Sequence, residues 1–395
     1  MKTNRFWGAT LLIMGTTVGA GMLAIPSTIG LAGLGLSIVL MSFIWLYMML
    51  TAYYLLEVNL RLPGETNMIT MMHKTLGRPG EIVAWIIYLF LLYSLTAAYI
   101  LGCGEILSHL LSHYMVLSGY VWSSLVVCLF SFFLYFGTRS VDYLNRFCIV
   151  GLAAGYMGLL VLGFPYVKGE FYLHASFSPF VSAIPVVVTS FGYHIIIPTL
   201  TTYLDHDVKL LRQAIFVGSL LAFLIYLFWL LLAVGVIPPY GKDSLAEARA
   251  SGLPTTIYLQ AIIQSKWMTT SAHAFSLFAI ITSLLGVSLS LTDFLADGLH
   301  IEKKGWKKAG LIFLTFAPPL VFAFAYPHGF ILALQYAGIF VLILLAILPA
   351  LMVYFERYVK EKDFLKSELR VFGGRSLVVI TIIVACFLLV VEVIK

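Results

Sequence analysis

The chain has 395 residues, of which 61% are hydrophobic and only 11% are charged. A typical soluble domain carries about 25% charged residues, so this composition excludes an ordinary soluble protein. The formal net charge of +6 does not indicate nucleic-acid binding, because the basic residues lie in short loops between long apolar runs, where membrane topology accounts for them.

The apolar runs have the length of membrane-spanning helices. A bilayer core is about 30 Å thick, so a spanning helix needs roughly 20 mostly apolar residues. The sequence therefore predicts an all-α polytopic protein, with a single domain embedded in the lipid bilayer. We expect eleven transmembrane helices, at residues 6–31, 34–58, 82–111, 119–137, 146–166, 178–201, 213–237, 268–296, 308–325, 329–354 and 375–392.

The basic residues indicate the orientation, because cytoplasmic loops are enriched in Lys and Arg. With the N terminus in the cytoplasm, all but five of the 24 basic residues fall on the cytoplasmic side. The five exceptions are Lys168, Lys242, Arg249, Lys266 and Lys395. We expect an uncleaved first span, a cytoplasmic N terminus and a C terminus on the opposite, periplasmic side.

Two loops carry patterns of their own. Residues 66–76 are followed by Gly77 and then Pro79, a normal helix stop, which predicts a short cytoplasmic helix. Residues 243–264 form the longest external loop and are expected to contain one or two helices over the outer face. The cysteines form no CxxC pair, so we expect no metal site, no disulfide framework and no cofactor.

The first and sixth spans carry matching interruptions. The first contains Gly15-Thr16-Thr17-Val18-Gly19-Ala20-Gly21-Met22, with Pro26 beyond, and the sixth contains Thr189-Ser190-Phe191-Gly192-Tyr193-His194, with Pro198 beyond. Proline lacks the N–H that bonds the carbonyl four residues earlier, and glycine permits non-helical backbone. Both helices are therefore predicted to break inside the membrane.

A break of this kind suits an amino-acid zwitterion. Freed backbone at membrane depth must be buried in protein or line a watery cavity. The new half-helix offers N–H groups to a carboxylate, and the preceding half ends in carbonyls that suit an ammonium group. Interrupted segments at matching places in two halves point to the binding site of a transporter. The alternative is that the glycines only allow close helix packing.

The two interruptions lie five spans apart. Because five is an odd number, the second half must be inserted upside down relative to the first. The sequence therefore predicts a 5+5 inverted repeat, with one repeat at residues 6–166, a second at 178–354 and an additional helix at 375–392.

Several stretches along nearly the full chain carry a family likeness. They are Gly15 to Pro26, Leu95 to Ile100 with Gly104-Glu105, Asn145-Arg146-Phe147, Ala183 to His194, Leu285-Gly286-Val287, Asp293 to Asp297, and Tyr326 to Phe330. Together they resemble the bacterial aromatic amino acid permeases, the tyrosine-specific ones in particular. The resemblance implies the five-plus-five fold of many amino-acid transporters and proton-driven symport across the inner membrane. Tyrosine is the first expected cargo, and tryptophan, phenylalanine or a broader range of amino acids is the alternative.

The first and sixth spans supply most candidate binding residues. Backbone amides at Ala20, Gly21 and Met22, beside Gly19, are expected to hold the substrate carboxylate. The hydroxyls of Thr16 and Thr17 lie nearby. Carbonyls near Thr189 and Ser190 are expected to take the ammonium group. Phe191 and Tyr193, around Gly192, are expected to stack on the substrate ring. His194 is expected to bond a phenolic hydroxyl or to carry a proton, and the alternative is a neutral histidine satisfied by the backbone.

Other candidates lie on the third and eighth spans. Tyr93, Thr96 and Tyr99 follow one another at intervals of three residues, which predicts a shared helix face toward the substrate. Packing or an interface position is the alternative for Tyr93. Ion- or proton-coupling candidates are Glu105, His194, Thr282, Ser283 and Asp293, because a buried carboxylate suits proton coupling and hydroxyls near the first break suit an ion.

The sequence disfavours two other classes of membrane protein. A channel needs pore-lining rings or filter loops, and the sequence shows neither. An intramembrane enzyme is disfavoured because HExxH and GxSxG motifs are missing from the sequence. The paired interruptions favour a secondary transporter, so we expect no enzymatic activity.

Overall fold

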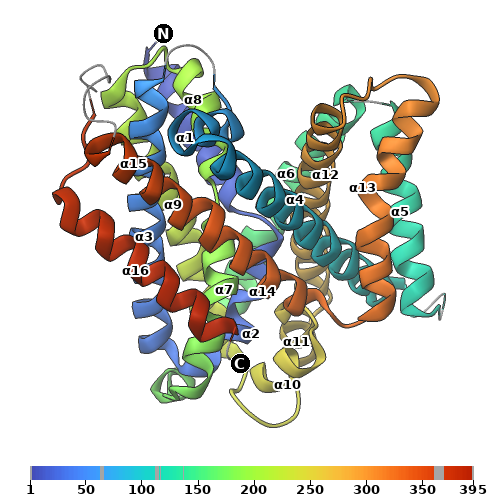
Figure 1. The fold of residues 1–395 in the computed structure, drawn as a ribbon. Coiled ribbons are helices and arrows are strands. Elements are labelled where there is room, and N and C mark those ends of the chain that lie inside the picture. Colours follow the sequence, from blue (N-terminus) through green and yellow to red (C-terminus); the bar gives the residue numbers. More distant parts are fainter. Residues whose placement is uncertain are drawn as a thin grey trace.

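The structure is a computed structural model that describes residues 2–62, 66–111, 115, 117–136, 138–359 and 369–393. Within these ranges every regular element is a helix, and ten helices are long and apolar enough to cross a membrane (Figure 1). The prediction of an all-α polytopic membrane protein is confirmed. The first predicted span is not among these ten, since its longest continuous helix has 16 residues, so the predicted count of eleven is not confirmed.

Most spanning helices match the predicted spans to within a few residues. The continuous ones are α3 (Leu34–Arg61), α4 (Met68–Leu111), α5 (Gly119–Phe136), α6 (Thr138–Gly163), α9 (Val208–Val236), α12 (Lys266–Gly298), α13 (Gly305–Ala325) and α16 (Gly374–Val393). One further span joins α14 (Phe330–Val341), a π-helical segment (Leu342–Ile347) and α15 (Leu348–Tyr358).

The helices predicted in the two loops are present. The one predicted at residues 66–76 forms the start of α4 and is set off from the span by Gly77, whose φ of 73° lies in the left-handed region that favours glycine. In the other loop, α10 (Leu245–Ser251) and α11 (Thr255–Ile262) follow one another across Gly252. Short 3-10 turns, η3 (Phe164–Tyr166) and η4 (Gly169–Leu173), link α6 to the sixth span.

The first and sixth spans are broken where the sequence predicts. The first consists of α1 (Lys2–Thr17), a 3-10 turn η1 (Ala20–Leu23), α2 (Ile25–Ile29) and a 3-10 turn η2 (Gly30–Ala32). The sixth consists of α7 (Ser178–Ser190), a 3-10 turn η5 (His194–Ile196) and α8 (Ile197–Tyr203). Pro26 and Pro198 stand at the starts of α2 and α8, where a missing N–H costs least.

The helices form two groups, and the broken spans pack in the one that holds α3 and α9 (Figure 1). In one group α12 packs on α6, α4 and α13, and α5 packs on α4 and α13. In the other group α9 packs on α1 and α3, α15 packs on α3 and α16, and α14 packs on α7. α4 runs diagonally between the groups and also contacts α14 and α15. The interrupted turns therefore lie where the two groups meet.

A buried ion-pair network fixes α15 to α3 at the end of the molecule that holds the N terminus. The Arg357 guanidinium donates to both Glu57 oxygens, and its Nε–Oε1 distance is 2.8 Å. Arg61 donates to the same carboxylate at 2.6 Å, and the Val371 amide donates to it at 2.8 Å. Glu57 is fully buried and Arg357 is 6% exposed, so this charge is compensated without water.

Candidate functional site

The two broken helices meet at their interrupted turns, where η1 packs against α7. A Cβ atom added to Gly21 would lie 2.9 Å from Ser190 Oγ, closer than real Cβ atoms approach. A larger residue at position 21 would push the first and sixth spans apart or displace the Ser190 side chain. The glycine therefore sets the distance between the two breaks.

A tyrosine from α9 joins the two helix ends. Tyr226 Oη lies 2.5 Å from the carbonyl oxygen of Thr17 and 2.9 Å from that of Ser190. All three residues are buried, and the Tyr226 ring meets the Phe191 ring edge-on at 5.3 Å between centroids. The two carbonyls end α1 and α7 and carry the partial negative charge of helix C termini. One hydroxyl hydrogen therefore serves two acceptors.

Sequence reasoning missed Tyr226 and its neighbour Trp229. Trp229 lies one turn further along α9, and its Nε1 donates to the Met22 carbonyl at 2.9 Å. Both side chains are fully buried. The three-residue spacing puts the two polar ring atoms on one face of the seventh span, but the chain has 22 tyrosines, so this spacing alone did not distinguish them.

The amides predicted for the substrate carboxylate are partly occupied. The Ala20 amide donates to Ser283 Oγ on α12 at 2.9 Å, and the Met22 amide donates to the Gly19 carbonyl at 3.1 Å. A Cβ atom on Gly19 would lie 2.6 Å from the same Ser283 oxygen. A carboxylate can therefore take the Ala20 amide only by displacing the Ser283 hydroxyl.

The hydroxyls predicted beside the breaks turn back onto their own helices. Thr16 and Thr17 donate to carbonyls four residues earlier, each at 2.7 Å. Thr189 and Ser190 do the same on α7, each at 2.8 Å. This pattern is usual for Ser and Thr inside a helix. In this structure the polar groups offered at the junction are main-chain carbonyls rather than these hydroxyls.

The residues of the sixth-span break point in different directions. Phe191 faces Tyr226, as described above. Tyr193 and His194 are fully buried with their rings 5.3 Å apart, and His194 Nε2 lies 2.9 Å from Thr51 Oγ1 on α3. Gly192 is half-buried between them and Phe191. The His194 side chain therefore packs toward α3 in this structure.

The three candidates on α4 do not form a single face. Tyr93 donates to the Leu314 carbonyl of α13 at 3.0 Å, and Thr96 donates to Leu92 of its own helix at 2.7 Å. Tyr99 is buried and lies near Tyr226. Each step of three residues turns a helix about 60° short of a full circle, so two steps carry Tyr99 away from the direction of Tyr93. Tyr99 is the member of the run that faces the junction.

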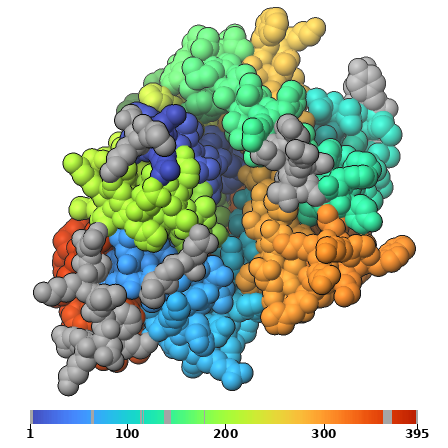
Figure 2. Space-filling model, turned by 90° about the horizontal axis from the view of Figure 1, so that it is seen from above, coloured from blue at the N-terminus to red at the C-terminus, as the bar shows by residue number. Residues whose placement is uncertain are grey.

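α1 and α12 pack loosely between the junction and the end of the molecule that holds the N terminus. Between the contact of Gly19 with Ser283 and this end of the molecule, a Cβ atom added to Gly15 on α1 or to Gly286 on α12 would meet nothing within 4 Å. Thr16 and Ser290, on the same two helices, are exposed. Figure 2 looks onto this end, and the surface is hollowed between α1 and α12.

The opposite end of the junction is closed by the loop helices. Thr255 of α11 donates to the Leu23 carbonyl at 2.9 Å, and a Cβ atom on Gly30 would lie 2.8 Å from Val234. Tyr258 Oη lies 2.9 Å from Ser251 Oγ, and burial raises the pKa of this tyrosine. The phenol therefore stays protonated and fixes α11 to α10. The site is open toward one side of the molecule only.

The acidic candidates lie at opposite ends. Glu105, near the end of α4, has one oxygen 3.2 Å from His328 Nδ1, whereas its Oε2 is buried without a hydrogen-bond partner in the described part of the chain. Asp293 forms an exposed ion pair with Lys303 at 2.7 Å. On α12, Thr282 donates to its own helix, so Ser283 alone of that pair bonds the first-span break.

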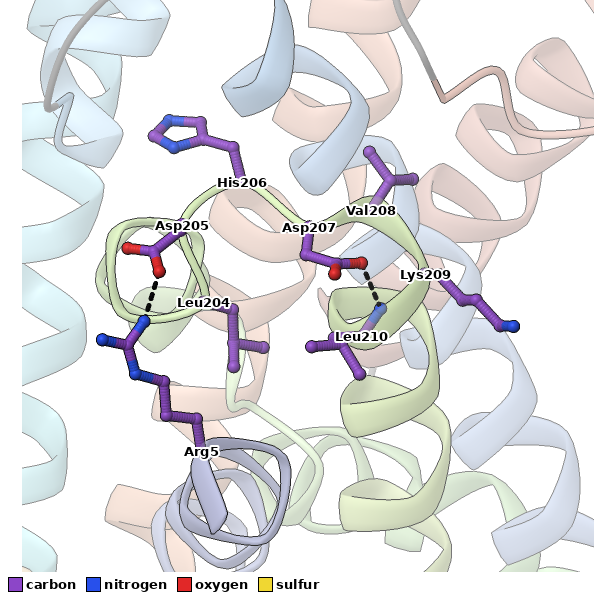
Figure 3. A pocket seen from close by; sticks show the side chains of 8 residues that line it. All are labelled: Arg5, Leu204, Asp205, His206, Asp207, Val208, Lys209 and Leu210. Carbon is purple, nitrogen blue, oxygen red and sulfur yellow. Dashed lines mark hydrogen bonds and ion pairs between the residues drawn. The ribbon is translucent and has the colours of Figure 1, made fainter. Parts of the chain in front are cut away.

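A separate pocket lies beside the start of α1. Arg5 and residues 204–210 line it, and Arg5 forms an ion pair with Asp205 in the turn between α8 and α9 (Figure 3). Asp207 caps α9 by accepting from the Leu210 amide at 3.1 Å. A Cβ atom on Gly8 would lie 2.6 Å from the Tyr203 hydroxyl, so α1 and α8 are also in close contact. This pocket is remote from the junction and joins the two half-helices at one end.

Comparison with known structures bears on the fold. A mutant of the manganese transporter of Eremococcus coleocola superposes with a TM-score of 0.64 over 98% of this chain and 85% of that one, at 14% sequence identity. At this identity the likeness shows a shared fold alone.

Comparison with known sequences covers nearly the whole chain. The tyrosine-specific transport system 1 of Haemophilus influenzae is 34% identical over 96% of this chain and 94% of its own length. A tryptophan-specific transport protein of the same organism is 31% identical, over 95% of this chain and 93% of its own length. A low affinity tryptophan permease of Escherichia coli is 30% identical, over 97% and 93%. The model of the tryptophan/tyrosine permease family matches residues 2–392, and the chain is a member of that family.

Proposed function

We propose that the protein imports an aromatic amino acid, tyrosine first, by proton symport across the bacterial inner membrane. The observation that carries this proposal is the junction of two broken helices, with two carbonyl ends and a half-helix N terminus at one place inside the membrane. Carbonyls suit an ammonium group and the N terminus suits a carboxylate. Relatives that are tyrosine- and tryptophan-specific transport proteins support the aromatic cargo.

Alternating access follows from the 5+5 architecture that we propose, with inverted repeats at residues 6–166 and 178–354. The open space on one side of the junction and the closed loop helices on the other side are what one state of such a cycle requires. With the N terminus in the cytoplasm, as the basic loops indicate, this state opens inward.

Of the predicted site residues, we assign those at the junction to the substrate: Gly19, Ala20, Gly21, Met22, Ser190, Phe191, Tyr99 and Ser283. We assign proton coupling to Glu105, one of whose carboxylate oxygens is buried without a hydrogen-bond partner in the described part of the chain, while the other lies beside His328. Burial makes the ionised form of a carboxyl costly, so its proton occupancy can be linked to a conformational change.

Transport by purified protein in proteoliposomes tests this proposal. Labelled tyrosine should accumulate when an inward proton gradient is applied and should exchange with unlabelled tyrosine without one. Competition by tyrosine, tryptophan and phenylalanine ranks the cargo, and tryptophan is the second candidate because several relatives are tryptophan-specific. Failure of all three to compete would refute the aromatic assignment, and accumulation without a proton gradient would refute symport.

A further inference from the structure

Tyr226 is placed as a substrate-positioning residue by its contacts. Its hydroxyl is the only side-chain group in the described part of the chain that bonds both Thr17 and Ser190 main-chain carbonyls. The side chain is fully buried, and its ring is held by Phe191. The oxygen therefore has a fixed position between the ends of α1 and α7.

The donors and acceptors at this point are unequal in number. Two helix-end carbonyls present two acceptors, and the tyrosine oxygen has acceptor lone pairs of its own, whereas its single hydrogen can satisfy one carbonyl at a time. Burial makes the remaining acceptor costly to leave without a donor. The Thr17 and Ser190 carbonyl oxygens and Tyr226 Oη therefore have fewer hydrogen-bond donors than acceptors, and a positive charge with further donors would stabilise them.

An amino-acid ammonium group meets that demand. It carries three N–H donors and one positive charge, which match three oxygens at two helix C termini. We propose that Tyr226 Oη is the third acceptor for the substrate ammonium, beside the Thr17 and Ser190 carbonyls, and that in the empty protein its hydroxyl holds these two helix ends together. This inference rests on the proposed function, because it requires an amino acid as cargo.

The change that tests this role is Tyr226→Phe, which removes the oxygen and keeps the ring that packs on Phe191. Three ligands separate the ammonium from the rest of the substrate: tyrosine, tyramine, which lacks the carboxylate, and 3-(4-hydroxyphenyl)propionate, which lacks the ammonium. Their inhibition of labelled tyrosine exchange is measured in proteoliposomes. A hydrogen bond to a charged group is worth enough to change affinity by about tenfold or more.

Tyr226→Phe is expected to weaken the binding of tyrosine and of tyramine by about tenfold or more and to leave the binding of the propionate unchanged. A purely structural role would weaken the binding of all three ligands together. The matched control is Tyr47→Phe, because Tyr47 is buried and its hydroxyl likewise donates to a main-chain carbonyl, that of Thr381 at 2.8 Å, but between α3 and α16 rather than at the junction. This control should leave the ratios of the three inhibition constants as they are in the natural protein.

Equal weakening of all three ligands, or unchanged binding of tyrosine, overturns the inference. Should Tyr226→Phe not reach the membrane, Tyr226→Met makes the same comparison, because it also removes the oxygen and fills the space of the ring with a flexible apolar side chain. Failure of the proposed function would look different, since the natural protein itself would then show no exchange of any aromatic amino acid.

Discussion

The glycine at position 21 shows how one missing side chain permits the site. Its Cα faces Ser190 so closely that even a Cβ atom would lie 2.9 Å from Ser190 Oγ. Gly19, two residues earlier, makes a similar approach to Ser283 of α12. The first break is thus held against both the sixth and the eighth spans by atoms that only glycine leaves room for.

Replacing Gly21 by leucine should reduce tyrosine uptake by about a hundredfold or more, because the side chain must enter the space of Ser190 and separate the breaks. Uptake into cells is normalised to the amount of protein in the membrane. The control is Gly310→Leu, since a Cβ atom at that position on α13 meets nothing within 4 Å. Normal uptake by the Gly21 variant would remove the substrate role of the first-span break.

Glu105→Gln should separate accumulation from exchange. The amide cannot take up and release a proton, so accumulation driven by a proton gradient should be lost, whereas exchange of labelled for unlabelled tyrosine should persist. Both are measured in the same proteoliposomes. Asp293→Asn is the matched control, because Asp293 is already held in an exposed ion pair with Lys303 and should retain both activities. Full accumulation by the Glu105 variant would contradict its coupling role.

At the scale of the element, the sequence predicts where the first and sixth spans break, but not which side chains from other helices bond the broken turns. Glycine and proline act on the backbone of their own helix, so the ends of α1 and α7 follow from local rules. The contacts of Tyr226, Trp229 and Thr255 join elements far apart in the chain, and no local pattern marks which of many tyrosines will reach a break. The same limit explains why the spacing of Tyr93 and Tyr99 predicts a shared helix face, whereas in the structure Tyr93 contacts α13 and Tyr99 lies near α9.

The pairing of α15 with α3 depends on a buried charge and can be tested by stability. Arg357→Met leaves the Glu57 carboxylate with fewer donors in a buried place, and breaking such a pair costs about 3–5 kcal/mol. The variant should denature at a lower temperature in detergent. The double substitution Glu57→Gln with Arg357→Met should recover much of the loss, because it also neutralises the buried carboxylate, while the partly exposed Arg61 can still donate to the amide oxygen that replaces it. Equal stability of the single variant and the natural protein would show that the network is not needed.

At the scale of the whole molecule, the open space between α1 and α12 defines a state of the protein. Gly15, Thr16, Gly286 and Ser290 border it on one side of the junction, and the loop helices cover the other side. Sequence alone predicts where both helices break, but not which side is open, because either state satisfies the same hydrophobic pattern.

Cysteine labelling can establish the accessible side. In a variant without the four natural cysteines, Thr16→Cys and Ser290→Cys should react with a membrane-impermeant thiol reagent in inside-out vesicles and much less in right-side-out vesicles. Ala24→Cys, at a buried position, is the control that should remain unreacted in inside-out vesicles. Preferential labelling in right-side-out vesicles would reverse the orientation that we infer.

The ion pair of Arg5 with Asp205 has a consequence for the cycle. Together with the contact of Gly8 and Tyr203, it ties α1 to α8 at the end remote from their breaks. Fastened in this way, α1 and α8 swing as a single body, and Tyr226 ties the other end of α1 to α7. A state in which one of these half-helices has moved and the others have not is thereby disfavoured, and with it a continuous path along which protons would leak unaccompanied by cargo.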